Sequence, residues 1–425
     1  MTDIGNSEVP TATHIETKRA PADKTEGKPI LVLNPDHGNE PYILATALGR
    51  EVSKKFAAAG MEQPILVLPL LYGDRQINIL LEENPNDAQL IHYDEEYGKI
   101  LHNIVFNAGN FSDHLAQVNQ HYDEVDKLLN NRYRATAESF STRSLATKER
   151  VELSPKNIIG TIDVGSRVSI KTPHRYFAFP MLLSELLQET MQHPELGFSE
   201  SDMKKLTQRM LRTESAYSQV FVPWINPFSS EHADNLAEQP TVINKRSRVY
   251  TPAMKEDMPR TAGAIPEPGV YIMFSGTGST VETNRALIQA AHNAGVEAYS
   301  PPWIDVEGTK KMTPDVLADE NMIAVLGRSG WGTGWQAFNL GLPWLVAEYQ
   351  KGDDPEIYFN NLTIEALRLG KVVDPSLNAQ ELLDLIKSVS PGLSVLRQRV
   401  KDKFGTLNGI DFIAESLFRD LITIK

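Results

Sequence analysis

The chain contains the segment Pro29-Ile-Leu-Val-Leu-Asn34, a polar loop Pro35-Asp-His-Gly-Asn-Glu-Pro41, and a second apolar run, Pro64-Ile-Leu-Val-Leu-Pro-Leu-Leu71. Continuous apolar runs of this length are typical of strands that are buried on both faces of a parallel sheet. Between the two runs, residues 42–56 carry apolar side chains at helical spacing. A strand, a loop, a helix and a strand make a βαβ unit with a right-handed crossover. Residues 29–71 therefore predict a Rossmann-like N-terminal lobe.

The same alternation starts again in the second half of the chain. Strands are predicted over residues 270–274, 296–299, 322–326 and 344–347, and helices over residues 281–294, 335–340 and 357–369. This pattern predicts a second Rossmann-like lobe. The expected fold is α/β, with two Rossmann-like parallel-sheet lobes that face a cleft.

The length of 425 residues fits two to three domains of ordinary size. Residues 95–220 show mostly helical periodicity, and several prolines and glycines between 236 and 268 are typical of a linker. The predicted organisation is a disordered leader at 1–27, an N-terminal Rossmann-like lobe at 28–245, an interdomain linker at 246–268, a C-terminal Rossmann-like lobe at 269–405 and a C-terminal helix at 406–425.

Composition excludes several classes of protein. The 42 Lys and Arg against 55 Asp and Glu leave a net charge of −13, which argues against a surface that grips nucleic acid. The absence of cysteine excludes disulfides, thiolate metal sites and a cysteine nucleophile. No run reaches the ~18–20 apolar residues that cross a bilayer. We expect a cytoplasmic protein.

Two glycine-rich loops follow predicted strands of the second lobe, where helix N-termini offer free amides to anions. Ser275-Gly-Thr-Gly-Ser279 has glycines that allow a close approach of the backbone, and hydroxyls that can donate. It is interpreted either as a phosphate-binding loop, through Gly276, Thr277, Gly278 and Ser279, or as an ordinary tight turn.

Gly327-Arg-Ser-Gly-Trp-Gly-Thr-Gly334 is more informative, because an arginine directly after a buried strand adds a permanent cation to a set of amides. This pattern suits a diphosphate. Gln336 is expected in the first turn of the next helix, either on sugar hydroxyls or on an exposed helical surface. The candidate ligands in this segment are Arg328, Ser329, Gly330, Trp331, Gly332, Thr333 and Gln336.

An acidic loop, Gln350-Lys-Gly-Asp-Asp-Pro-Glu356, follows the next strand. Its carboxylates, Asp353, Asp354 and Glu356, are interpreted either as acceptors for sugar hydroxyls or as a solvated loop.

Residues 270–371 resemble the C-terminal lobe of GT-B-fold glycosyltransferases. Arg328-Ser-Gly330 with Thr333 is similar to a segment of the bacterial lipid II N-acetylglucosaminyltransferase, and Gly330-Trp331 with Gly341-Leu-Pro343 resembles the signature box of UDP-dependent glycosyltransferases. The resemblance implies that Arg328 meets the donor diphosphate and that Gln336 stands where relatives use an acid on the ribose.

The resemblance also places a carboxylate of the acidic loop on the donor sugar. Counting back four residues from Asn360 lands on Glu356, with Asp353 and Asp354 as the competing choices. Trp303 stands where the family holds the nucleotide base, or it is a packed core residue.

In the first lobe, Asp36-His-Gly-Asn-Glu-Pro41 resembles a Gly-His-x-x-Pro-like segment that lines the acceptor side in such enzymes. His37 is then the candidate general base, because a neutral imidazole with a pKa of ~6.5 can take the proton of an acceptor hydroxyl. Loop packing or helix capping by His37 is the alternative, and Asp36 and Glu40 compete for the same role. No second pair of ligands at useful spacing accompanies Asp36 and His37, so no metal and no cofactor are expected.

Two segments bear on the acceptor, which we expect to be a small molecule, a lipid or a glycan. The aromatic run at 221–228 and the basic segment at 131–150 together suit an anionic membrane surface, or else a buried turn and a solvated helix. Peripheral membrane contact is therefore one expectation, and nucleic acid is not a predicted partner.

The predicted function is a metal-independent glycosyltransferase that moves a hexose from a nucleotide-diphosphate sugar to an acceptor hydroxyl. UDP-sugars are the first candidates for the donor. Two alternatives remain open: a nucleotide-sugar epimerase of the same fold, and a non-catalytic subunit that binds sugar nucleotides. The second gains weight from Gln336, which replaces an acid.

Overall fold

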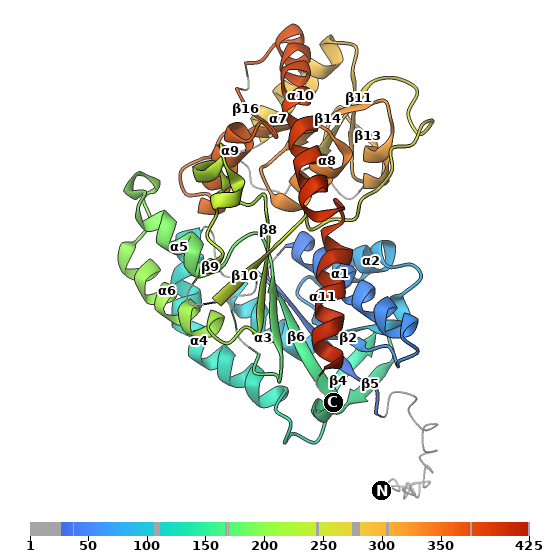
Figure 1. Cartoon of the computed structure of the whole chain (residues 1–425), viewed down its shortest axis with the longest axis vertical. Helices are drawn as coiled ribbons and strands as arrows, with labels where there is room; N and C mark the ends of the chain where they lie inside the picture. Colours follow the sequence, from blue (N-terminus) through green and yellow to red (C-terminus); the bar gives the residue numbers. More distant parts are fainter. Residues whose placement is uncertain are drawn as a thin grey trace, which may run out of the picture.

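The strands of the protein form two sheets, one in each half of the chain, in a computed structural model that describes residues 27–36, 38–105, 111–165, 168, 170–243, 246–273, 281–302, 306–374 and 376–423. Figure 1 shows the N-terminal lobe in blue and green and the C-terminal lobe above it in orange and red. Helices pack around both sheets. The predicted two-lobed α/β fold is confirmed.

The N-terminal sheet is built around β1, which is buried over its whole length and pairs in parallel with β2 and β6. Pairing is parallel from β3 to β10, and β4, β5 and β9 add antiparallel strands at the two edges. The order across the sheet is β5 (Arg150–Leu153), β4 (Phe140–Ser144), β3 (Ile91–Asp94), β2 (Ile65–Pro69), β1 (Ile30–Pro35), β6 (Ile158–Val164), β7 (Arg175–Ala178), β8 (Gln219–Pro223), β10 (Arg246–Thr251) and β9 (Val242–Ile243).

The predicted βαβ unit is present, and its helix is longer than the apolar periodicity indicated. It begins at Asn39, within the predicted polar loop, and Leu44, Leu48 and Val52 are buried on its inner face. The helices of this lobe are α1 (Asn39–Ala58), α2 (Gly73–Glu83), α3 (Glu95–Val105), α4 (Phe111–Arg132), α5 (Leu183–Met191) and α6 (Glu200–Glu214).

The C-terminal sheet is parallel throughout its described strands. Its order is β13 (Lys310–Lys311), β12 (Glu297–Ser300), β11 (Gly269–Met273), β14 (Met322–Gly327), β15 (Trp344–Ala347) and β16 (Gly370–Val373). Its helices are α7 (Val281–Asn293), α8 (Trp331–Leu340), α9 (Pro355–Ala366) and α10 (Ala379–Phe404), and the chain ends with α11 (Gly409–Ile422).

Residues 95–220 contain the helices α3 to α6, as the helical periodicity predicts, together with the strands β4 to β7 and the first residues of β8, which the periodicity did not indicate. The central strand β6 was missed because polar residues interrupt its apolar pattern. These residues are nevertheless buried because each finds a partner: the Thr161 and Thr172 hydroxyls are 2.9 Å apart, and the Asp163 carboxylate accepts from Arg175 at 2.9 Å.

Residues 246–251 were expected in the linker, but they form β10, which pairs in parallel with β8. The strand was not predicted because two arginines, Arg246 and Arg248, interrupt its apolar pattern. Arg248 is buried and donates to both carboxylate oxygens of Glu185 in α5, at 2.8 and 2.9 Å. The segment that joins the two sheets therefore begins after Thr251.

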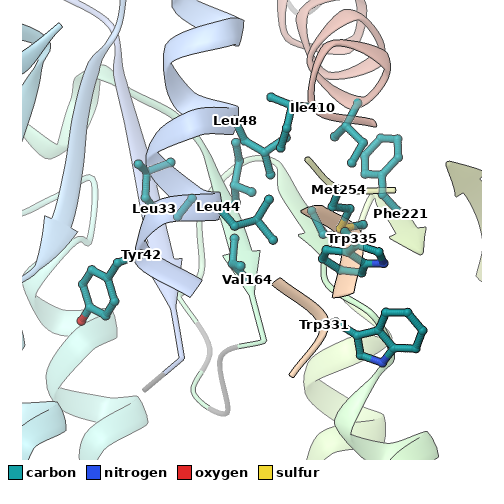
Figure 2. Close-up of a cluster of buried hydrophobic side chains, with 14 of the residues drawn as sticks. Leu33, Tyr42, Leu44, Leu48, Val164, Phe221, Met254, Trp331, Trp335 and Ile410 are labelled. Atoms are coloured by element: carbon teal, nitrogen blue, oxygen red, sulfur yellow. The ribbon is translucent and has the colours of Figure 1, made fainter. Parts of the chain in front are cut away.

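The last helix returns to the N-terminal lobe and lies along α1 (Figure 1). Lys55 of α1 pairs with Asp411 at 2.6 Å and with Glu415 at 3.3 Å. One apolar core is shared by both lobes: Figure 2 shows Leu44 and Leu48 of α1 with Ile410 of α11, near Met254 and Trp335.

Helix α9 also joins the lobes. Its Phe359 ring lies 5.4 Å from that of Phe228 and 5.5 Å from that of His193, both in the N-terminal lobe. The Thr363 hydroxyl donates to the Pro227 carbonyl at 2.6 Å. α9 is therefore packed between the C-terminal sheet and the N-terminal lobe.

Candidate functional site

Arg328 and the acidic loop lie at the same edge of the C-terminal sheet. β14 and β15 are parallel neighbours, so the segments that follow Gly327 and Ala347 leave the sheet side by side. Gly327 is required at this exit, because a Cβ there would lie 2.0 Å from the carbonyl oxygen of Met273 in β11. The edge at which ligands bind in parallel α/β sheets thus carries one arginine and several carboxylates.

Helix α8 begins at Trp331, four residues earlier than predicted, so the expected loop at 331–334 is the first turn of the helix. Gln336 consequently lies in the second turn rather than the first, and it is 9% exposed. The two glycines that suggested a loop are packing positions instead. A Cβ on Gly334 would lie 2.2 Å from the Trp344 ring, and one on Gly332 would lie 2.0 Å from Cδ of Glu40.

The N-terminus of α8 carries no side-chain cap, because its N-cap residue is Gly330. The amides of a first helical turn have no partner within the helix and carry a partial positive charge. Among the described residues, nothing lies within 4 Å of a Cβ on Gly330, so these residues leave space beside this turn. The arrangement suits an anion such as a phosphate.

Arg328 and Asp353 form an ion pair, with Nη2 and Oδ1 2.9 Å apart and with side chains 15% and 12% exposed. The Arg328 Nε atom is buried and has no partner among the described residues. Burial raises the pKa of Asp353, Arg328 lowers it, and Asp354 raises it again. The predicted diphosphate ligand and one predicted sugar ligand are thus in direct contact.

Asp354 is the N-cap of α9, and its Oδ1 accepts from the Glu356 amide at 3.0 Å, with Pro355 at the first helical position. This cap directs Glu356 back toward Arg328. Burial, and then the Asp354 charge, raise the pKa of Glu356 to about 7, whereas Asn360 and Arg328 lower it. A carboxyl group with this pKa changes its charge near neutral pH.

The N-terminal lobe reaches the same place through the segment after β1. Asp36 lies close enough to Glu356 to raise its pKa. Glu40, in the first turn of α1, lies against Gly332, and its Oε1 accepts from Lys255 Nζ at 2.8 Å. Both competitors of His37 for the role of base therefore lie beside the C-terminal lobe.

Two predicted ligands turn their side chains away from this opening. The Ser329 hydroxyl is fully buried and donates to the Ile357 carbonyl at 3.4 Å. The Trp331 ring is 3% exposed and packs between Trp335 and Trp344, at centroid distances of 5.8 and 5.9 Å. These two residues offer a ligand their backbone only. Thr333 is partly exposed.

Several predictions lie outside the described residues. They concern His37, the loop residues Gly276, Thr277, Gly278 and Ser279, and Trp303.

Sequence reasoning missed Lys255, which holds Glu40. Lys255 lies between the lobes, and its contact with Glu40 forms only because distant segments of the chain meet there. No local sequence pattern could therefore predict this contact.

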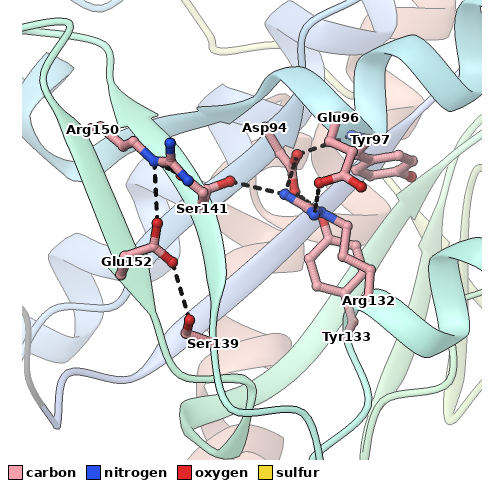
Figure 3. A network of polar contacts seen from close by, with 9 residues as sticks. All are labelled: Asp94, Glu96, Tyr97, Arg132, Tyr133, Ser139, Ser141, Arg150 and Glu152. Atoms are coloured by element: carbon pink, nitrogen blue, oxygen red, sulfur yellow. Dashed lines mark hydrogen bonds and ion pairs between the residues drawn. The ribbon is translucent and has the colours of Figure 1, made fainter.

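The segments that suggested a membrane surface are occupied by internal contacts. In the aromatic run, Phe221 and Trp224 are buried, at 0% and 6% exposure. In the basic segment, Arg132 donates to Asp94, and Arg150 pairs with Glu152 at 3.2 Å (Figure 3). No helix of the described residues has the length and apolarity to span a bilayer.

Within the described residues, no group of three or more histidine, aspartate or glutamate side chains is arranged to hold a metal ion.

No protein-family model matches the chain, and no curated protein matches it. Solved structures do. Medicago truncatula UGT71G1 complexed with UDP-glucose aligns at 10% identity with a TM-score of 0.56, covering 93% of this chain and 98% of that one. A Polygonum tinctorium UDP-glucosyltransferase capable of glucosylating indoxyl aligns at 12% identity and 0.56, with the same coverage. Arabidopsis thaliana UGT89C1 complexed with UDP aligns at 11% identity and 0.55, covering 93% and 100%. At such identities the likeness is one of architecture, and its coverage of 93% of the chain includes parts of both lobes. The chain therefore has the GT-B fold, the two-lobed architecture of these glycosyltransferases.

Proposed function

We propose that the protein is a glycosyltransferase that moves a hexose from a nucleotide-diphosphate sugar, with a UDP-sugar as the first candidate, to an acceptor hydroxyl. The observation that carries this proposal is the uncapped N-terminus of α8 with the Arg328 guanidinium beside it. The structures that share the fold include complexes with UDP and UDP-glucose. The donor would lie on the C-terminal lobe and the acceptor on the N-terminal lobe.

In the reaction, the acceptor oxygen forms a bond to the anomeric carbon, and the bond from that carbon to the diphosphate oxygen breaks. The nucleoside diphosphate leaves with the electron pair, so negative charge grows on its terminal phosphate. Arg328 and the first amides of α8 stabilise this charge more in the transition state than in the ground state. This step needs no metal, because a fixed guanidinium and helix amides supply the positive charge.

The acceptor proton passes to a base on the N-terminal lobe. We propose His37 for this role, with Asp36 and Glu40 as the alternatives. Oε1 of Glu40 already accepts a hydrogen bond from Lys255 at 2.8 Å, so this carboxylate is partly occupied. The hydroxyls of the donor sugar would donate to Asp353, Asp354 and Glu356.

The first test is binding. Thermal shift and calorimetry with UDP, TDP, GDP and ADP, and with their sugars, should single out one nucleotide, since a ligand of the folded state raises the melting midpoint. The second test is turnover with a panel of phenols, alcohols, lipids and glycans, in which mass spectrometry detects the addition of one hexose.

The alternatives give different outcomes. If the protein converts a UDP-sugar into its epimer when no acceptor is present, the protein is an epimerase rather than a glycosyltransferase. Nucleotide binding with no turnover on any acceptor would favour a non-catalytic subunit. No binding of any nucleoside diphosphate would exclude all three.

A further inference from the structure

Asn360 lies inside α9, four residues after Glu356, and its side chain is fully buried. Its amide contacts three groups. Nδ2 donates to the Ser329 carbonyl at 2.5 Å and to Oε1 of Glu356 at 3.2 Å, and Oδ1 accepts from the Trp331 indole at 2.5 Å. One side chain thus touches the Arg328 turn, the first turn of α8 and the acidic end of α9.

These partners fix the orientation of the amide. The Trp331 indole can only donate and the Ser329 carbonyl can only accept, so Oδ1 and Nδ2 of Asn360 cannot exchange places. Both protons of Nδ2 and one lone pair of Oδ1 are used by the protein. Asn360 therefore has no donor left for a ligand and acts through its neighbours.

We propose that Asn360 is a positioning residue, which ties the turn that holds Arg328 to the Glu356 carboxylate, so that the group facing the diphosphate and the group facing the sugar keep one relative geometry. The inference rests on the proposed function, because it assigns those two ends of the donor. Asn360 connects the acidic loop to the arginine turn, which neither segment can do alone.

The rotation of α9 about its axis is fixed independently, by the residue next to Asn360. Phe359 is 5% exposed and packs against Phe228 and His193 of the N-terminal lobe. Successive helix residues point about 100° apart. With Phe359 held by one lobe, Asn360 is directed at the Ser329 carbonyl and the Trp331 indole of the other.

The electrostatics support the link. Glu356 lies among the carboxylates of Asp354 on its own helix and Asp36 of the N-terminal lobe, with Arg328 as the opposing cation. The Asn360 amide lowers the pKa of Glu356 against burial and against those two negative charges. Its loss would leave Glu356 protonated over a wider pH range.

The test compares Asn360→Asp with Asn361→Asp. Asn361 is a matched control: it is a buried asparagine on the same helix, 7% exposed, and it donates to the backbone carbonyl of Ala347, at 3.1 Å, rather than to Ser329 or Glu356. Calorimetry would measure the Kd of UDP and of UDP-glucose from about pH 5.5 to pH 8.5, a range that brackets carboxyl and histidine titrations near neutrality.

For Asn360→Asp we expect the affinity for UDP-glucose to fall about 10- to 100-fold at neutral pH, because a buried donor is lost and a carboxylate faces both Glu356 and a carbonyl. UDP alone should lose less, since it does not reach Glu356. The pH midpoint for UDP-glucose binding should move upward. Asn361→Asp should leave both affinities and the midpoint unchanged.

Trp331→Phe provides a second variant in case Asn360→Asp does not fold. It keeps the ring but removes the indole N–H that fixes the amide, and we expect the same shift in the UDP-glucose midpoint with a smaller loss of affinity. Wild-type behaviour in both variants, or equal losses in Asn360→Asp and Asn361→Asp, overturns the inference and leaves the glycosyltransferase proposal standing. A wild-type protein that binds no nucleoside diphosphate overturns both.

Discussion

Glu40 of the N-terminal lobe lies directly against Gly332 of the C-terminal lobe. A Cβ on Gly332 would fall 2.0 Å from Cδ and 2.3 Å from Oε1 of Glu40, whose carboxylate is held in place by Lys255. The first turns of α1 and α8 therefore touch across the lobes, and only glycine at 332 permits the contact.

Gly332→Ala should consequently destabilise the closed arrangement of the lobes. The added methyl group displaces the end of the Glu40 side chain from its ion pair with Lys255. Because this flexible side chain can move aside, we expect a loss of about 1 kcal/mol or less. Calorimetric unfolding measures the effect. Gly330→Ala is the control, since no described residue lies within 4 Å of its Cβ position. Combining Gly332→Ala with Glu40→Ala should restore stability, and a simple sum of the two losses would contradict the contact.

Arg328→Ala should lower kcat/KM roughly 10- to 1,000-fold, because it removes one charged contact to the leaving diphosphate. Steady-state kinetics and UDP binding measure the loss. Asp353→Asn separates the two partners of the ion pair: it keeps the guanidinium and should reduce the rate less. An unchanged rate in Arg328→Ala would remove this residue from the site.

The pKa of about 7 for Glu356 predicts a pH-dependent stability. Because this pKa lies above that of the unfolded chain, the folded state binds more protons between the two values, and stability falls as the pH rises through that window. Glu356→Gln should therefore raise the melting temperature at pH values above 7 and lose this advantage toward about pH 4.5. A gain of equal size at both ends would show that Glu356 does not titrate.

Asp354 combines a cap and a charge, which two substitutions separate. Asp354→Ala should cost about 1 kcal/mol through loss of the N-cap, whereas Asp354→Ser keeps a capping oxygen and should cost less. Both remove a negative charge that raises the pKa of Glu356, so both should move its titration downward. Carboxyl carbon NMR of labelled glutamate follows that titration, and an unmoved signal would contradict the assignment.

His37→Ala should lower kcat about 10²- to 10⁴-fold while donor affinity is nearly kept, as expected for loss of a general base. Asp36→Asn and Glu40→Gln test the two competitors. If either of them abolishes turnover while His37→Ala does not, the base is the carboxylate. Loss of UDP binding in His37→Ala would assign the imidazole to the donor instead.

Much of the fold was predictable because buried parallel strands have uninterrupted apolar sequences. β1, β2, β14 and β15 were all located this way. β6 and β10 were not, since Asp163 and Arg248 lie within them and are paired only through residues distant in the chain.

In the candidate site, too, local motifs were predictable and contacts between distant residues were not. The Arg328 turn and the acidic loop were visible as motifs, and the structure brings Arg328 and Asp353 into contact. The onset of α8 was misjudged because Gly332 and Gly334 suggest a loop until Glu40 and Trp344 are known to fill the space beside them. The three-way role of the Asn360 amide depends on tertiary geometry, and so does the contact of Lys255 with Glu40.

The two passages of the chain between the lobes lie next to each other. The amide of Gly409 donates to the carbonyl of Ala253 at 2.9 Å, and a Cβ on Gly409 would lie 2.2 Å from that oxygen. Beyond this point α11 completes the surface of α1, through Lys55 and the Phe56–Phe418 ring contact. The lobes are therefore not interchangeable modules. A chimera with a foreign donor half must cut the chain at both passages and retain α11 with its native α1, or each half is left with an uncovered apolar face.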